Sequence, residues 1–218
     1  LYTFMNLVVI TSCLNPIKKN LSYTNIRSIY TVEERYLQTI NTINTIKKNI
    51  PCSYIVLLEC SKDIGVYEMK IKDYVNEYHN YCNNKKVVDA VNSIYKNYGE
   101  VMTLIEFFNN FKNIDKINDL YKITGRYWLN EKFNLNTYIN TKNNFFSLTE
   151  SQVVSTRFFK ITNSQINNFI EKLNNSIKND VITGISIEAS MFKNIDFKHI
   201  NVLGLSGNIS VNGDLVVE

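Results

Sequence analysis

The segment Met5–Thr11 (MNLVVIT) is the feature that most limits what this chain can fold into. It is a continuous run of apolar, largely β-branched residues, and residues that favour turns follow it. A strand of this composition is usually covered on both faces, as in the middle of a parallel sheet. The run therefore predicts a buried parallel strand near the start of the sequence.

A helix and a second buried strand follow this segment. Thr31 and Glu34 have the spacing of a capping box, and apolar residues recur at helical intervals until Asn49, just before Pro51. The next apolar run is Ser53–Glu59 (SYIVLLE). Strand, helix and strand in this order indicate a right-handed βαβ unit. We therefore predict an α/β fold in which helices flank a mostly parallel, Rossmann-like sheet.

The later elements are predicted from the same periodicities and from turn signals. Helical spacing is found in Tyr67–Lys85, Glu100–Phe111 and Asn163–Lys178, the last capped by Asn163 or Ser164; strand patterns are found in Asp119–Leu129 and Val153–Ile161. Val87–Val91 is too short to assign, and Gly184–Met191 fits a strand or a short helix. Asn212-Gly213 between alternating runs predicts a closing antiparallel hairpin. Without a repeat or linker, residues 1–218 are expected to form one domain, with Met5 as a candidate natural start.

Charge and cysteine content exclude several classes of protein. The net charge of +4 comes from lysines interspersed with acidic residues, so we expect no nucleic-acid partner. The four cysteines include no CxxC pair, which argues against a structural zinc site. Cys13 and Cys60 follow predicted strands, where we expect reduced thiols that line the core; the alternative is a reactive nucleophile. No apolar run is long enough to span a membrane and no secretory signal is found, so a cytoplasmic protein is expected. The surplus of Asn, Ile and Lys suggests an AT-rich genome.

Four polar segments follow predicted strands or begin a helix, where α/β sheets bind their ligands. They are Thr11-Ser12-Cys13, Glu59-Cys60-Ser61-Lys62-Asp63, Lys96-Asn97-Tyr98-Gly99-Glu100 and Lys122-Ile123-Thr124-Gly125-Arg126-Tyr127. We expect them to meet around one site. Gly-rich dinucleotide loops, Walker loops, nucleophile elbows and zinc-protease motifs do not occur in the sequence.

The order of these segments resembles that of glycosyltransferases with the A-type nucleotide-sugar fold. The loop that holds the base and ribose in this family is similar to Glu59-Cys60-Ser61-Lys62-Asp63. A segment that lies over the nucleotide in the family is similar to Asn97-x-Gly99. Uncharacterised members from viruses and polysaccharide gene clusters share three patterns with this sequence. Here they are Glu34–Ile40, Lys122–Tyr127 and Leu203–Ile209, and Arg35 belongs to the first of them. The resemblance implies a nucleotide-sugar donor and a hydroxyl acceptor on a glycan, lipid or protein.

The sequence departs from this family at the metal site. Members usually carry an Asp-x-Asp that holds Mn²⁺ or Mg²⁺ against the diphosphate, and this sequence has none. Thr124-Gly125-Arg126-Tyr127 takes that place, and a guanidinium can bind a phosphate through two hydrogen bonds. We therefore predict metal-independent binding with Arg126 at the diphosphate. The alternative is that Arg126 pairs with a carboxylate and only orders its loop.

The predicted site contains residues in two roles. Glu188 and Glu100 are candidate catalytic bases, because apolar neighbours can raise the pKa of a carboxyl group. The candidates for binding the nucleotide-sugar are Thr11, Ser12, Arg35, Glu59, Ser61, Asp63, Lys96, Gly99, Gly125, Arg126, Tyr127 and Arg157. Two other hypotheses remain open: a non-catalytic module that binds nucleotide-sugars or glycans, and a nucleotidyltransferase, although the Gly-rich loop of the latter is missing.

Overall fold

The computed structural model describes residues 5–139, 144–150, 152–180 and 185–218. Within these ranges the strands form a seven-stranded sheet with the order β10-β6-β9-β4-β1-β2-β3, a three-stranded sheet with the order β12-β11-β5, and the pair β7-β8. The strands are β1 Met5–Ser12, β2 Tyr54–Glu59, β3 Glu77–Asn80, β4 Ile117–Thr124, β5 Tyr127–Leu129, β6 Phe145–Phe146, β7 Leu148–Glu150, β8 Val153–Val154, β9 Phe158–Thr162, β10 Lys198–His199, β11 Leu205–Asn208 and β12 Leu215–Val217. The helices are α1 Val32–Asn49, α2 Val66–Lys72, α3 Lys85–Val91, α4 Lys96–Asn110, α5 Ile166–Asn179 and α6 Ile187–Asn194, with 3₁₀ turns at Ile114–Lys116, Leu135–Thr137 and Asn163–Gln165.

Strand β1 lies in the middle of the large sheet. It pairs in parallel with β2 on one side and with β4 on the other, and β3 continues the sheet in parallel beyond β2. Strand β9 runs antiparallel to β4. The predicted α/β fold with a mostly parallel central sheet is confirmed.

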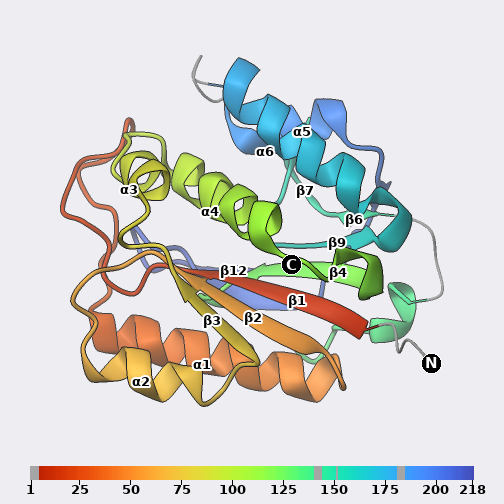
Figure 1. Ribbon diagram of the computed structural model, residues 1–218, viewed down its shortest axis with the longest axis horizontal. Helices are drawn as coiled ribbons and strands as arrows, with labels where there is room; N and C mark the ends of the chain where they lie inside the picture. Colours follow the sequence, from red (N-terminus) through yellow and green to blue (C-terminus); the bar gives the residue numbers. More distant parts are fainter. Residues whose placement is uncertain (1–4, 140–143, 151, 181–184) are drawn as a thin grey trace.

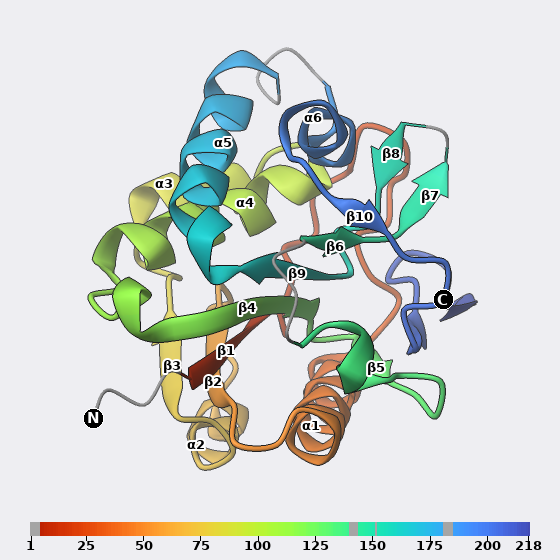
Figure 2. The same cartoon turned by 90° about the vertical axis from the view of Figure 1, so that its right-hand side faces the viewer.

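Helices cover both faces of this sheet, as the two ribbon views show (Figures 1 and 2). Helices α1 and α2 lie on one face, and α4, α5 and α6 lie on the other. Successive residues of β1 alternate between the two layers: Leu7 and Val9 belong to the core under α4 and α5, whereas Val8 and Ile10 belong to the core over α1. Both faces of β1 are therefore buried, which explains its unbroken apolar sequence.

The start and end of α1 are confirmed as predicted. The Thr31 hydroxyl accepts a hydrogen bond from the amide of Glu34, and the Glu34 carboxylate accepts one from the amide of Thr31. The helix ends at Asn49. A capping box is a local signal, so it can be recognised without knowledge of the tertiary structure.

The prediction of one helix over Tyr67–Lys85 is wrong. Helix α2 ends at Lys72, and strand β3 occupies Glu77–Asn80, where it pairs with β2 at the edge of the sheet. Tyr78 packs against the core on the α1 side, whereas the ring of His79 lies 5.6 Å from that of Phe107 on the opposite side. Sheet pairing thus overrides a helical pattern in a short, polar edge strand.

Two further predictions need correction in the second half. Val153–Ile161 is not one strand, because β8 pairs with β7 in a separate small sheet and β9 begins only at Phe158. Helix α5 begins at Ile166 without a side-chain cap. Asn163 instead donates a hydrogen bond to the carbonyl oxygen of Ile117, which joins the 3₁₀ turn before α5 to the start of β4.

The predicted C-terminal hairpin is confirmed. Strands β11 and β12 are antiparallel, and Gly213 between them has a φ of 81°, a conformation that favours glycine. Strand β11 also pairs with β5, directly after the Gly125-Arg126 turn. The two segments that the sequence did not assign are helical. Val87–Val91 lies within α3. In Gly184–Met191, residue 184 is outside the described part, and Ser186 caps helix α6. The hairpin therefore lies beside the carboxyl end of β4.

Candidate functional site

A pocket opens where the strand order of the parallel sheet reverses. From β1 the chain builds β2 and β3 on one side, and it then returns to place β4 on the other side of β1. Open α/β sheets bind ligands at such a position. The pocket encloses about 900 Å³, including space open to solvent. It is lined by Thr11, Ser12, Cys13, Leu14, Pro16, Ile17, Arg27, Arg35, Thr39, Cys60, Val91, Asn97, Gly99, Glu100, Thr103, Thr124, Gly125, Arg126 and Ser210.

Each of the four segments singled out from the sequence contributes to this lining. Thr11 and Thr124 are register partners at the ends of β1 and β4, and the Gly125 amide donates to the Thr11 carbonyl oxygen at 2.9 Å. Cys60 enters from the end of β2, and Gly99 from the first turn of α4. The structure thus places residues of all four segments around one pocket.

Two of the arginines that line the pocket are held by the protein itself. Arg35 donates to the Ser28 hydroxyl at 2.9 Å, to the Cys13 carbonyl oxygen at 3.0 Å and to the Ser210 hydroxyl. Arg27 donates to backbone carbonyl oxygens of residues 19, 91 and 93. Burial lowers the pKa of Arg35 to about 10, and the charge of Arg126 is the second largest cause. Arg35 therefore stays cationic at neutral pH. Both arginines add positive charge while they hold the segment between β1 and α1.

Arg126 differs from these two in its partners. Its guanidinium donates to the carbonyl oxygen of Asn208 at 3.1 Å, and its Cζ atom lies 5.3 Å from the centroid of the Tyr127 ring. None of the ion pairs found between described residues includes Arg126. The carboxylate partner of the loop-ordering alternative is therefore not found in this part of the chain. Since a guanidinium has five N–H groups, donors remain for a ligand.

The beginning of α4 also faces the pocket. Tyr95 precedes the helix and supplies no side-chain cap, and Asn97, Gly99 and Glu100 of the first turns line the pocket. Uncapped amides at a helix start favour anions. A Cβ atom on Gly99 would lie 2.8 Å from a side-chain atom of Val91, so glycine allows α4 to pack closely against α3.

Glu100 lies in the pocket wall, but it is engaged in a buried network. Its Oε1 atom accepts hydrogen bonds from Lys122, from the Thr11 hydroxyl and from the Thr124 hydroxyl at 2.9 Å. Burial alone would raise the pKa of Glu100, but the charge and hydrogen bonds of Lys122 hold it below its ordinary value. The expected raised pKa is wrong for this residue. Lys122 also donates to the Thr156 carbonyl oxygen at 2.6 Å, so its ammonium group is fully engaged.

Glu188 has the raised pKa that the sequence suggested. It stands in the first turn of α6, and its Oε1 atom accepts hydrogen bonds from Asn97 and from the Thr156 hydroxyl at 3.2 Å. Burial is the main cause of the raised pKa. Glu188 does not line the pocket itself, but its partner Asn97 does. The charges of Arg126 and Glu188 both influence the pKa of the exposed Tyr23.

The loop after β2 is held together by Glu59. Its carboxylate is fully buried, and its Oε1 atom accepts the amide hydrogens of Leu14 at 3.2 Å and of Cys60 and Ser61 at 2.9 Å. Ser61 is buried as well, and its hydroxyl accepts the amide of residue 15. Asp63 is exposed. None of Glu59, Ser61 and Asp63 lines the pocket.

Two other predicted residues, Arg157 and Tyr127, are also outside the pocket lining. Arg157 pairs with Glu218 and stacks over the ring of Tyr127, 5.7 Å from its centroid. Tyr127 is buried between Arg126 and Arg157. The side chain of Lys96 lies outside the described residues.

The sequence did not identify Arg27 and Ser210 as part of the site. Both belong to irregular segments, and their position depends on contacts between distant parts of the chain. The Ser210 hydroxyl, for example, donates to the Arg27 carbonyl oxygen at 2.8 Å across 183 residues of sequence. The one available signal was the terminal element Leu203–Ile209, which ends directly before Ser210.

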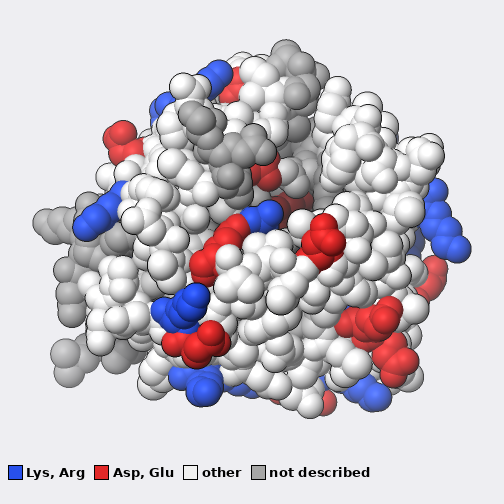
Figure 3. Space-filling model, turned by 180° about the vertical axis from the view of Figure 1, so that it is seen from behind, with Lys and Arg blue, Asp and Glu red and all other residues white. Residues whose placement is uncertain are grey.

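The outer surface carries both signs of charge. On the face opposite to that of Figure 1, basic and acidic side chains lie in small separate groups with broad uncharged areas between them (Figure 3). Among the described helices, none has the length and apolar character needed to cross a bilayer. The concentration of arginines in the pocket is thus a local feature.

No protein-family model matches the sequence, and no curated protein is significantly similar to it. Solved structures do resemble it. A proposed nucleotide-diphospho-sugar transferase from Desulfovibrio desulfuricans G20 has a TM-score of 0.47 and 5% identity, with 89% of this chain and 79% of that chain covered. A 4-diphosphocytidyl-2C-methyl-D-erythritol synthase from Anaerococcus prevotii DSM 20548 has a TM-score of 0.45 and 8% identity, with 90% and 87% covered.

Proposed function

We propose that this protein is a glycosyltransferase that moves a sugar from a nucleotide-sugar donor to a hydroxyl group on a glycan, lipid or protein. The observation that carries the proposal is the cationic pocket at the strand-order reversal, where Arg126 and the uncapped start of α4 face the same space. The resemblance of the ordered motifs to A-type glycosyltransferases supports this choice of ligand.

The diphosphate would bind between Arg126 and the start of α4. Arg27 and Arg35 add positive charge, although their N–H groups already bond to protein oxygens. As the bond between sugar and phosphate breaks, negative charge grows on the leaving diphosphate, and a guanidinium stabilises this charge. Metal-independent transfer is proposed on this basis, because a nearby guanidinium repels a divalent cation and no Asp-x-Asp is present.

Glu188 is the proposed base for an inverting transfer. In such a step the carboxylate takes the proton of the acceptor hydroxyl while the oxygen attacks the sugar carbon that carries the diphosphate. Its raised pKa suits this role better than the lowered pKa of Glu100, whose carboxylate is neutralised by Lys122.

The proposal is tested with a panel of UDP-, GDP-, CMP- and dTDP-sugars. Release of free nucleotide is measured with EDTA or with Mn²⁺, together with the thermal stability of the protein in each nucleotide. We expect one donor to be turned over in EDTA, and Arg126→Ala to weaken its binding. Arg157→Ala is the matched control, because Arg157 is outside the pocket lining. Stabilisation without turnover would favour a binding module, and nucleotide binding unaffected by Arg126→Ala would contradict the role of this residue.

A further inference from the structure

Two cysteines leave neighbouring strands side by side in the wall of the pocket. Ser12 and Glu59 are the last register partners of β1 and β2, so Cys13 and Cys60 occupy the next pair of positions. Adjacent strands are about 4.8 Å apart. The Cα atoms of a disulfide are usually separated by about 4.4–6.8 Å. The backbone spacing therefore suits a bond between these two residues.

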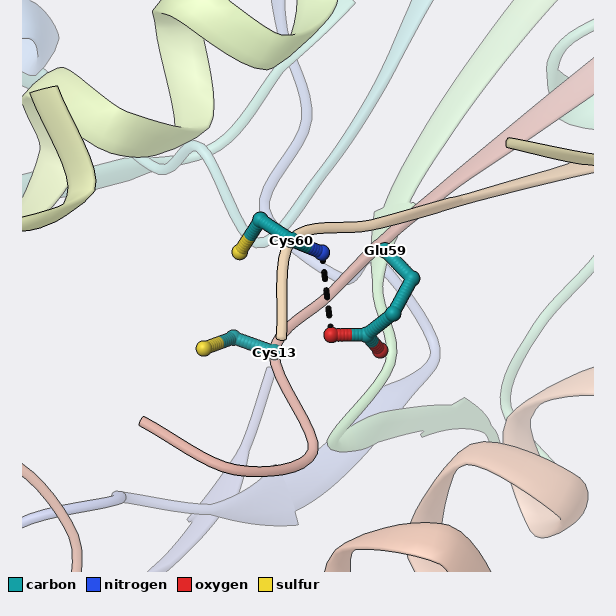
Figure 4. Close-up of side chains that lie close together, drawn as sticks. All are labelled: Cys13, Glu59 and Cys60. Atoms are coloured by element: carbon teal, nitrogen blue, oxygen red, sulfur yellow. Dashed lines mark hydrogen bonds between the residues drawn. The ribbon is translucent and has the colours of Figure 1, made fainter. Parts of the chain in front are cut away.

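The orientation of the thiols agrees with this spacing. Figure 4 shows both sulfur atoms on the same side of the chain, as expected for residues in register on parallel strands. The two Sγ atoms lie within 4.8 Å of each other, and both cysteines are free thiols. Both residues are partly exposed, and both line the pocket, which is open to solvent.

The two thiols are not equivalent. The Sγ atom of Cys13 accepts a hydrogen bond from the Ser61 hydroxyl at 3.5 Å, whereas the Sγ atom of Cys60 donates to the Ser12 carbonyl oxygen at 3.5 Å. The interaction with Cys60, the hydrogen bond from Ser61 and the charge of Arg35 lower the pKa of Cys13 against the opposing effect of burial. The interaction with Cys13 and burial raise that of Cys60. Cys13 is therefore the better nucleophile of the pair.

A metal ion is a less suitable occupant of this cluster. The carboxylate of Glu59 is the third potential ligand: its Oε1 atom accepts three amide hydrogens, and its buried Oε2 atom has no hydrogen-bond partner among the described residues. An oxygen of this carboxylate lies within 4.8 Å of both sulfur atoms, but these three groups are fewer than the four ligands of a structural zinc site. The remaining pair of thiols is suited to redox chemistry.

We propose that Cys13 and Cys60 form a thiol-modification site in the pocket wall, with Cys13 as the attacking and Cys60 as the resolving thiol. The oxidant is a small disulfide such as oxidised glutathione. The Cys13 thiolate bonds to one of its sulfur atoms, and the other glutathione leaves as a thiolate. Cys60 gives its proton to this thiolate and then attacks the Cys13 sulfur, which releases the second glutathione. Two protein thiols are oxidised to one disulfide, and the external disulfide is reduced to two thiols.

The experiment uses the full chain, reduced and then incubated with oxidised glutathione, and follows intact mass and peptide maps. The wild-type protein is expected to lose two hydrogens and to yield a peptide that joins Cys13 to Cys60. Cys60→Ser should instead accumulate glutathione on Cys13, whereas Cys13→Ser should leave Cys60 unmodified over the same time. Cys82→Ser is the matched control and should behave as the wild type. No nucleotide is present, so the outcome is independent of the proposed glycosyl transfer.

Three results would overturn the proposal. Glutathione that persists on wild-type Cys13 without a cross-link would show that Cys60 does not resolve the adduct. Faster modification of Cys60 than of Cys13 would reverse the two roles. Thiols that react only after a chelator has removed zinc would identify a metal site. The wild-type measurement decides the cross-link even if a variant folds poorly, and circular dichroism checks the fold of each variant.

Discussion

The guanidinium of Arg35 donates a hydrogen bond to the carbonyl oxygen of Cys13, 3.0 Å away, and thereby joins helix α1 to the segment that leaves strand β1. The same side chain donates to Ser210 in the turn between β11 and β12. One buried cation thus connects three parts of the chain that surround the pocket. Its fork of planar N–H groups is needed for this, because a lysine ammonium cannot reproduce the same directions.

Replacement of Arg35 by lysine should therefore destabilise the protein and loosen the segment before α1. We expect a loss of about 2–3 kcal/mol in the free energy of unfolding, because buried acceptors lose their donors. Urea unfolding followed by circular dichroism measures this loss. Hydrogen exchange should speed up at the amide of Ile29, which donates to the Ser210 carbonyl oxygen, more than at Val9 in the core of β1.

Arg157→Lys is the comparison for this variant. Arg157 is partly exposed and pairs with Glu218, so its replacement should cost less than about 1 kcal/mol. Equal stability losses in the two variants, or unchanged exchange at Ile29 in Arg35→Lys, would show that Arg35 does not hold this segment.

The ion pair between Lys122 and Glu100 should be important for stability. Lys122 is almost fully buried, so Lys122→Met would leave the Glu100 carboxylate without its cation. Removal of one partner of a buried pair costs about 3–5 kcal/mol. Lys86→Ala, which breaks an exposed pair with Glu106, should cost less than about 1 kcal/mol. Urea unfolding compares the two variants, and similar losses would contradict the buried pairing.

The ion pair between Lys122 and Glu100 also predicts how the stability of the fold changes at acid pH. The pKa of Glu100 is lower in the folded state than its ordinary value of 4.5. The carboxylate therefore contributes stability that is present above pH 4.5 and is lost as the pH falls through the folded pKa. Glu100→Gln should be less stable than the wild type at neutral pH, and the difference should shrink in acid. A difference that stays constant with pH would argue against this linkage.

Two glycines allow steric crowding to be separated from backbone strain. Gly204 and Gly65 both have positive φ, at 70° and 53°. A Cβ atom on Gly204 would lie 2.2 Å from the backbone of Phe133, whereas one on Gly65 would meet nothing within 4 Å. Gly65→Ala should cost about 1 kcal/mol from strain alone, and Gly204→Ala should cost clearly more. Thermal unfolding of both variants measures the difference, and equal losses would contradict the close approach of Phe133.

The sequence predicted those parts of the fold whose signals are local. Strand β1 and helix α1 were predicted because an apolar run and a capping box depend on neighbouring residues alone. Strand β3 was not predicted, because Glu77–Asn80 becomes a strand only by pairing with β2. The interruption between β8 and β9 also depends on tertiary contacts, since β8 pairs with β7 instead of continuing the large sheet.

The same distinction applies to the site. The segments around the pocket were predicted because parallel strands end at a common edge, which follows from the fold class. The partners of individual side chains did not follow from it. Glu100 faces Lys122 through the packing of α4 on the sheet, so its lowered pKa could not be foreseen from apolar neighbours in sequence. Arg27 was missed because the path of the segment between β1 and α1 depends on its own contacts with residues 91 and 93.

The pH dependence of the proposed transfer should reflect Glu188. Burial raises the pKa of its carboxyl group above the ordinary value of 4.5, so the base is inactivated by protonation at a higher pH than an exposed glutamate. We expect the turnover rate to fall as the pH decreases through this raised pKa. Glu188→Gln should lower turnover by about 10²–10⁴-fold and remove the acid limb. Donor affinity should change little, because Glu188 does not line the pocket.

Thr156→Val is a useful companion to this variant, because it removes one hydrogen bond to the Glu188 carboxylate without removing the base. Loss of a hydrogen bond that stabilises the charged form raises a carboxyl pKa. The acid limb should therefore shift to higher pH in Thr156→Val, with a maximal rate close to that of the wild type. An acid limb that persists in Glu188→Gln would mean that another group is the base.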